Sequence, residues 1–202
     1  MTMPINLNMN INPLDLLKFF KECWGQSINP RQINPVLEPM KRCKGLIAFV
    51  SAGSGASSAK EAINFHKHGP DNLSGPMLHH IWLLYSPLSQ SGAEELKDYA
   101  EKRNIKCSKK KLDITDDVHN IKRIKDQLDK VADEAIEEGM RYEDIAIDLT
   151  GGSKVVSLGF FLSALIYGFK LQIMIPNEID ENGRAVPDAG SKPFSIELRC
   201  NK

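Results

Sequence analysis

The sequence predicts an α/β fold, in which a doubly wound, mainly parallel sheet carries helices on both faces. Three observations predict it. Short, continuous apolar runs at 46–50 and 81–85 are typical of strands that are covered on both sides. Segments with apolar residues at helical spacing, such as 118–135, lie between the runs. Strand and helix alternate regularly along the chain, and this alternation implies a parallel sheet.

The expected elements can be justified in chain order. Ser86-Pro87 stops the second strand, Asp116 or Asp117 caps the long third helix, and Pro176 ends the fifth strand. The last strand alternates as an edge strand would. Strands are expected at 46–50, 81–85, 105–112, 144–149, 171–175 and 194–199. Helices are expected at 59–68, 93–102, 118–135 and 155–167.

The N-terminal segment, which precedes the alternating strands and helices, has a different sequence pattern. Residues 1–44 are expected to form an N-terminal arm with a short helix, and residues 45–202 a Rossmann-like domain. The helix is predicted from apolar residues at helical spacing, Leu14, Leu17, Phe20 and Trp24. A long helix is excluded by Pro30, Pro35 and Pro39.

Composition excludes several classes of protein. The 26 basic and 26 acidic residues give a net charge of zero, so no general attraction to duplex nucleic acid or to membranes is expected. Four scattered cysteines without a CxxC pair predict reduced thiols, no metal site and a cytoplasmic location. No secretory signal is visible, and the most apolar window, 155–167, is shorter than the roughly 20 residues of a membrane span.

The segment Asp148-Leu149-Thr150-Gly151-Gly152-Ser153-Lys154 carries the clearest functional signal. It follows a buried strand and precedes an apolar helix. Glycines let the backbone approach a ligand closely. Free N–H groups at the start of the helix attract negative charge, and Lys154 adds a full positive charge there. Ser153 is a plausible N-cap. The sequence therefore predicts an anion site.

Two further loops leave the carboxyl ends of predicted strands, where open α/β sheets bind ligands. The first runs from Ser51 to Ser58, and the second begins at Ser86. The first loop has Ser58 where a dinucleotide fingerprint requires its third glycine, and no P-loop is present. Taken alone, its small residues only permit a tight turn. No cofactor is expected.

Together these segments resemble the CARF (CRISPR-associated Rossmann fold) family. The segment 148–154 followed by an apolar helix looks like its signature, with Ser153 in place of the commoner threonine. The Ser/Gly-rich loop after the first strand and Tyr85-Ser86-Pro87 after the second also fit. The resemblance covers about residues 45–200. It implies a homodimer that binds cyclic oligoadenylates, the second messengers of type III CRISPR antiviral immunity.

The resemblance also implies which residues line the cleft. The expected ligand-binding residues are Ser51, Ala52, Gly53, Ser54, Gly55, Ser57, Ser86, Thr150, Gly151, Gly152, Ser153 and Lys154. Two alternatives remain open. A metal-independent ring nuclease would use the same site, with Lys154 stabilising the charged phosphorane and Ser51, Ser54 or Ser57 orienting the ribose. A metabolic enzyme that binds a nucleotide phosphate would instead have a site within one subunit.

Two further expectations concern symmetry. The helix 155–167 is apolar nearly all round, which predicts cover by a partner subunit in a homodimer. A two-fold axis suits a ring with an even number of nucleotides. The short loops favour cyclic tetra-adenylate over the six-membered ring, with one ring bound per dimer.

Overall fold

The structure is a computed structural model. It describes residues 33–52, 55–69, 77–113, 120–183, 185–186 and 189–200. It divides the chain into two compact units, of which the larger is Leu37–Glu197 and the smaller comprises Met1–Val36 and Leu198–Lys202. The larger unit holds the sheet core and the predicted site. The expected short helix within residues 1–44 lies outside the described residues, as does the expected cap at Asp116 or Asp117.

The described residues contain seven strands in one sheet, in the order β1-β7-β6-β5-β2-β3-β4. The strands are β1 Ile33–Pro39, β2 Gly45–Val50, β3 His80–Tyr85, β4 Lys106–Lys111, β5 Ile145–Asp148, β6 Lys170–Pro176 and β7 Ser191–Cys200. The pairs β4–β3, β3–β2, β2–β5 and β5–β6 are parallel, whereas β7 runs antiparallel to β6. The predicted doubly wound, mainly parallel α/β fold is confirmed.

The order corrects one expectation about the edge of the sheet. The last strand, β7, was expected at the edge, but β1 lies beyond it in the strand order. Pro35 and Pro39 in β1 made this segment look like part of an arm without a strand. Proline is tolerated in a strand that pairs on only one side, because the missing N–H is then not needed for the ladder.

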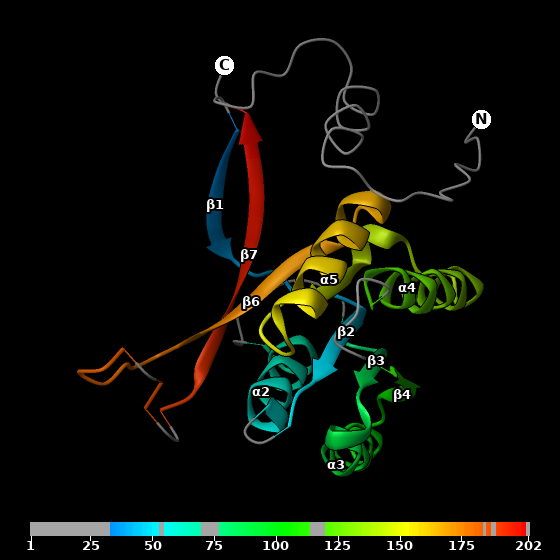
Figure 1. The fold of residues 1–202 in the computed structure, drawn as a ribbon, viewed down its shortest axis with the longest axis horizontal. Coiled ribbons are helices and arrows are strands. Elements are labelled where there is room, and N and C mark those ends of the chain that lie inside the picture. The colour runs from blue at the N-terminus through cyan, green and yellow to red at the C-terminus, as the bar shows by residue number, and fades with distance from the viewer. Residues whose placement is uncertain are drawn as a thin grey trace. The chain divides into compact units, whose positions relative to one another are not determined.

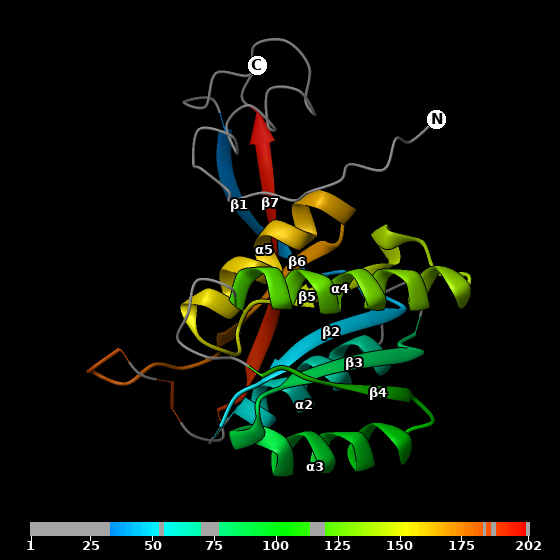
Figure 2. The ribbon, with the colours of Figure 1, turned by 45° about the vertical axis from the view of Figure 1, so that its right-hand side comes forward.

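Within the described residues, four helices cover the two faces of the sheet. They are α2 Gly55–Lys67, α3 Gln90–Glu101, α4 Asn120–Glu137 and α5 Lys154–Tyr167. Figure 1 labels them, and Figure 2 shows α4 and α5 on one side of the sheet with α2 and α3 on the other. None of the helices in the described part of the chain has both the length and the apolar character of a membrane span.

Alternate residues of the strands build two separate cores. Ile47 and Phe49 of β2 point toward α4 and α5, whereas Leu46, Ala48 and Val50 point toward α2 and α3. All residues of β2 are buried, which explains the continuous apolar run. The two helices α4 and α5 come close together at Gly159, where an added Cβ would lie 2.8 Å from Ile124.

The boundary of α2 differs from the expected one. The helix begins at Gly55, four residues before the expected start at Ala59. Ser57 and Ser58 therefore belong to the first turns of a helix and not to the loop. The loop after β2 is shorter than expected, which brings the start of α2 close to the end of its strand.

Candidate anion-binding site

The strand order places the end of β2 at a topological switch point. From β2 the chain continues to β3 and β4 on one side, and then returns to β5 and β6 on the other. Ala48 of β2 pairs with Asp148 of β5 in parallel register. The loops after β2 and β5 therefore leave the same edge of the sheet next to each other. Open α/β sheets bind ligands in the crevice at this position.

Asp148 and Thr150 fix the course of the loop after β5. Asp148 is only 3% exposed, and its Oδ1 accepts hydrogen bonds from the Thr150 backbone N–H at 3.0 Å and the Thr150 hydroxyl at 2.6 Å. The hydroxyl in turn accepts a hydrogen bond from the Met174 backbone N–H at 2.7 Å. Thr150 thus ties the loop to both β5 and β6. Burial raises the pKa of Asp148 to about 6.

The two glycines are required by the backbone of the loop. A Cβ at Gly151 would lie 2.3 Å from the carbonyl oxygen of Phe49 in β2, so any residue other than glycine requires the backbone to move. Gly152 has a φ of +94°, a region that other residues rarely adopt. The glycines therefore let the start of α5 press directly against the end of β2.

The start of α5 is positively charged and not neutralised by the described residues. Ser153 is the N-cap, and its hydroxyl accepts a hydrogen bond from the Val156 N–H at 3.5 Å, which confirms the predicted cap. Lys154 opens the helix, is exposed, and has no ion pair within the described part of the chain. Neither α2 nor α5 has an acidic residue in its first turn. The N-terminal partial charges of both helices and the Lys154 ammonium therefore lie at one edge.

The structure places the other predicted site residues as follows. Ser51 is half-buried and Ala52 is exposed directly after β2. Gly53 and Ser54 lie outside the described residues, whereas Gly55 and Ser57 are in the first turn of α2. The remaining predicted residue, Ser86, follows β3, one strand away from the switch point on the β2 side. Its backbone N–H donates to Ser89 Oγ at 3.1 Å.

Two components of the site were not assigned a role from the sequence. Asp148 was identified only as part of a motif. An Asp side chain that accepts a hydrogen bond from the backbone N–H two residues later is, however, typical of a turn. The carbonyl oxygen of Phe49 gives no sequence signal at all. Within the described ranges, no group of three His, Cys, Asp or Glu side chains is placed to hold a metal ion.

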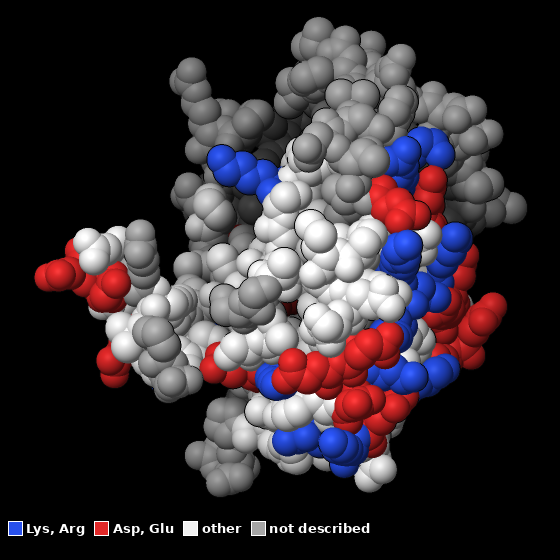
Figure 3. Space-filling model, turned by 60° about the horizontal axis from the view of Figure 1, so that its bottom comes forward, with Lys and Arg blue, Asp and Glu red and all other residues white. Residues whose placement is uncertain are grey.

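The lysines of β4 are paired with acidic side chains and do not form a positive rim. Lys106 pairs with Glu138 at 2.6 Å and Lys111 with Asp113 at 3.4 Å. Two further pairs join the strand to its helices, Lys109–Glu94 and Lys110–Glu134. Figure 3 shows basic and acidic side chains intermixed on the face it presents. The charges of β4 are thus largely compensated.

Comparison with known proteins gives the following. No protein-family model matches the sequence, and no curated protein matches it. Among solved structures, protein VC1899 from Vibrio cholerae is 15% identical, with a TM-score of 0.48, 66% of this chain covered and 31% of that chain.

Two other solved structures contain a bound ligand. Can2 from Sulfobacillus thermosulfidooxidans in complex with cyclic tetra-adenylate is 13% identical, with a TM-score of 0.49, covering 73% of this chain and 38% of that one. Enterococcus italicus Csm6 bound to cyclic hexa-2'-fluoro-hexa-dAMP is 11% identical, with a TM-score of 0.48, covering 67% and 34%. The chain spans about a third of the length of these proteins. Such scores transfer neither ligand nor activity to this chain.

Proposed function

We propose that this chain binds cyclic oligoadenylate at the edge formed by the loops after β2 and β5, and acts as a homodimeric, cytoplasmic sensor in type III CRISPR antiviral signalling. One observation carries the proposal. The signature that resembles the CARF family lies at the topological switch point, where Lys154 and two helix starts lie without a described acidic partner.

The chemistry of the edge suits a cyclic phosphodiester. Each phosphate carries one negative charge, which an ammonium group and free helix N–H groups stabilise. Gly151 and Gly152 let the start of α5 approach the end of β2 closely, which keeps the N–H groups of that helix start at this edge. Ser51 and Ser57 supply hydroxyl groups that can donate to phosphate or ribose oxygens.

Exposed apolar residues on α5 support the homodimer. Val155 is 37% exposed, Leu158 46% and Ile166 40%, although the helix is packed against the sheet and α4. Their spacing puts them along one outward side of the helix. A second copy of the chain would cover this side and bring two Lys154 side chains to one ring. Cyclic tetra-adenylate is the proposed ring, bound once per dimer.

Incubation with cyclic tetra-adenylate and cyclic hexa-adenylate, without metal, tests this function. Binding without cleavage over hours supports the sensor. Cleavage to linear products would instead assign the site to the ring nuclease alternative, with Lys154 and Ser51 as its catalytic residues. If the protein neither binds nor cleaves either ring, this result contradicts the proposal and favours the nucleotide-phosphate enzyme.

A separate measurement tests the homodimer. Light scattering at micromolar concentration is expected to give twice the 22.6 kDa mass of the chain. A Leu158→Glu variant should shift the protein toward the monomer, because it places two charges in the apolar contact. A monomeric wild-type protein would contradict the shared site.

A further inference from the structure

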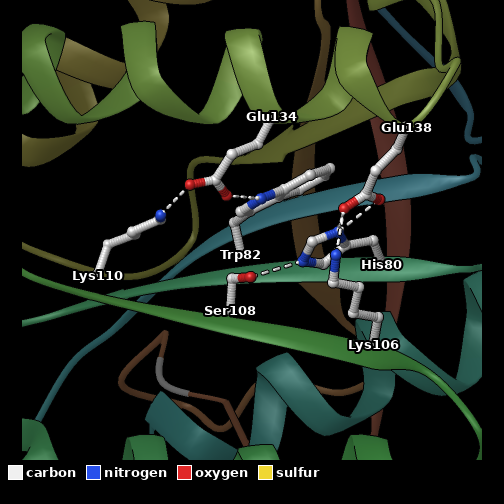
Figure 4. Close-up of polar contacts among 7 residues, drawn as sticks. All are labelled: His80, Trp82, Lys106, Ser108, Lys110, Glu134 and Glu138. Carbon is white, nitrogen blue, oxygen red and sulfur yellow. Dashed lines mark hydrogen bonds and ion pairs between the residues drawn. The ribbon is translucent and has the colours of Figure 1, made fainter.

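A second cluster of reactive side chains lies away from the switch point, between β3, β4 and α4 (Figure 4). His80 is the first residue of β3, and thus lies at the end of that strand opposite to the proposed anion site. Ser108 belongs to β4, and Glu138 directly follows α4. The three residues are separated by 28 and 58 positions in sequence, so no local motif indicated them.

The three side chains form a continuous chain of hydrogen bonds. His80 Nε2 lies 2.9 Å from Ser108 Oγ, and His80 Nδ1 lies 2.8 and 3.0 Å from the two carboxylate oxygens of Glu138. An ionised carboxylate only accepts, so Nδ1 carries the proton. Nε2 then has a free lone pair, which accepts the proton of the Ser108 hydroxyl. Nucleophile, base and orienting carboxylate stand in the order of a Ser-His-Glu triad.

The environment holds the imidazole ring in one orientation. His80 is 1% exposed and stacks on Trp82, with ring centroids 3.9 Å apart and an interplanar angle of 24°. Trp82 Nε1 donates to Glu134 at 3.0 Å, which anchors the stack to α4. Burial lowers the pKa of His80 below its ordinary value and outweighs the Glu138 and Glu134 carboxylates, which raise it, while Lys106 lowers it further. The ring is therefore a neutral base at neutral pH.

The nucleophile is partly exposed. Ser108 is half-buried, and it lies on β4, the last strand in the order of the described sheet. The N–H groups of Lys106 and Leu112 point toward β3, because they donate to His79 and Tyr85. The intervening Lys109 N–H therefore points to the outer edge. It follows the nucleophile directly, the position from which backbone donors stabilise an oxyanion.

We propose that Ser108, His80 and Glu138 form a nucleophilic site for carboxylic esters, independent of the anion site. Ser108 Oγ attacks the ester carbonyl carbon while its proton passes to His80 Nε2. The bond to the alkoxy group breaks, and the departing alcohol takes that proton. Water then attacks the acyl-serine with His80 as base, which releases the acid and restores the Ser108 hydroxyl. Glu138 acts as a positioning residue for the imidazole.

Labelling with a fluorophosphonate probe tests the site. Ser108 Oγ forms a bond to phosphorus, fluoride leaves, and the proton goes to His80 and then to solvent. Peptide mass spectrometry is expected to find the adduct on Ser108. Ser108→Ala should abolish it, and His80→Ala should slow it by about 100-fold or more, the usual share of a general base. Ser195→Ala is the matched control, since Ser195 lies on β7 and its hydroxyl contacts no histidine among the described residues.

The pH dependence separates this proposal from a structural role and needs no variant. The labelling rate of the wild-type chain should rise through the pKa of His80 and then stay constant. Glu138→Gln should slow labelling by at least about tenfold and change this profile, because the ring loses its orienting charge. A rate that climbs with hydroxide up to pH 10, no adduct on Ser108, or equal rates in the His80 and Ser195 variants would overturn the proposal. Lys130→Ala, at an exposed position of α4, should leave labelling unchanged, and so should saturating cyclic tetra-adenylate, so this test is independent of cyclic oligoadenylate binding.

Discussion

Lys154 at the switch point differs from the lysines of β4 in whether an acidic side chain neutralises its charge. β4 has a lysine at four of its six positions, yet these pair with Glu138, Glu94, Glu134 and Asp113. Lys154 stands alone in sequence, yet it opens a helix without a described acidic partner. A single unpaired charge at a helix start therefore attracts an anion more strongly than a denser cluster whose charges are compensated.

The largest expected effect concerns ligand affinity. Lys154→Ala should weaken the binding of cyclic tetra-adenylate by at least about tenfold, because a charge-assisted contact to phosphate contributes about 1.5–3 kcal/mol and a dimer loses two. Calorimetry measures the change. Lys130→Ala, an exposed lysine of α4, is the control and should leave the affinity unchanged. Equal affinity in both variants would place the ligand elsewhere.

A second prediction concerns the close approach of the loop to β2. Gly151→Ala should lower the free energy of unfolding by about 1–3 kcal/mol, because its Cβ would meet the Phe49 carbonyl oxygen and the backbone must move. Chemical denaturation measures it. Gly92→Ala is the control, since only a Val50 methyl group lies near, at 3.3 Å. If both substitutions cost the same, the loop does not press against β2.

A third prediction compares the two ends of β5. Folding raises the pKa of Asp148 from 3.8 to about 6, so the folded protein holds this proton more tightly than the unfolded chain does. Stability contributed by Asp148 is therefore lost as the pH rises from about 4 to about 6. Asp148→Asn should remove this loss and increase the free energy of unfolding at pH 7 by ~1–3 kcal/mol.

Asp144, at the other end of β5, provides the opposite case. Its carboxylate bonds to Arg141 and Lys44, which lower its pKa. Asp144→Asn should therefore destabilise the protein at pH 7. Denaturation curves between pH 4 and 8 measure both variants. A loss of stability at pH 7 in Asp148→Asn would show that its charge is needed by Thr150.

The smallest effect on ligand affinity is expected at the paired lysines of β4. Lys110→Ala removes a half-buried partner of Glu134 and should change cyclic tetra-adenylate affinity by less than about twofold, with a stability change of about 0–1 kcal/mol. The same calorimetric titration checks it. A loss comparable to that of Lys154→Ala would mean that β4 contributes to the ligand site after all.

Sequence patterns predicted the sheet well where the signal is local. The apolar run of β2 reflects burial on both faces of the sheet, which neighbouring residues report directly. The apolar helix after Lys154 was likewise predicted from its own residues. Sequence patterns failed to predict features that depend on contacts between residues far apart in the chain. The pairing of Lys110 with Glu134 depends on the packing of α4 over β4, which no spacing within 102–111 reveals.

The candidate site was predicted in part for the same reason. Gly151, Gly152 and the Ser153 cap belong to one segment, and their backbone roles follow from it. The contact of Gly151 with Phe49 and the bond from Met174 to Thr150 join segments 24 or more residues apart. Such contacts explain why the loop has its shape, and only the fold shows them.

Backbone amide chemical shifts, recorded while cyclic tetra-adenylate is titrated into the isotope-labelled protein, test the central claim most directly. The paired lysines lie on β4, whereas Lys154 and its loop follow β5, so the backbone amides of the two regions report ligand binding separately. We expect the largest shift changes at Gly151, Gly152, Ser153 and Ser51, and none above background along β4. Saturating changes confined to residues 106–111 and α4, or none at the switch point, would contradict the account.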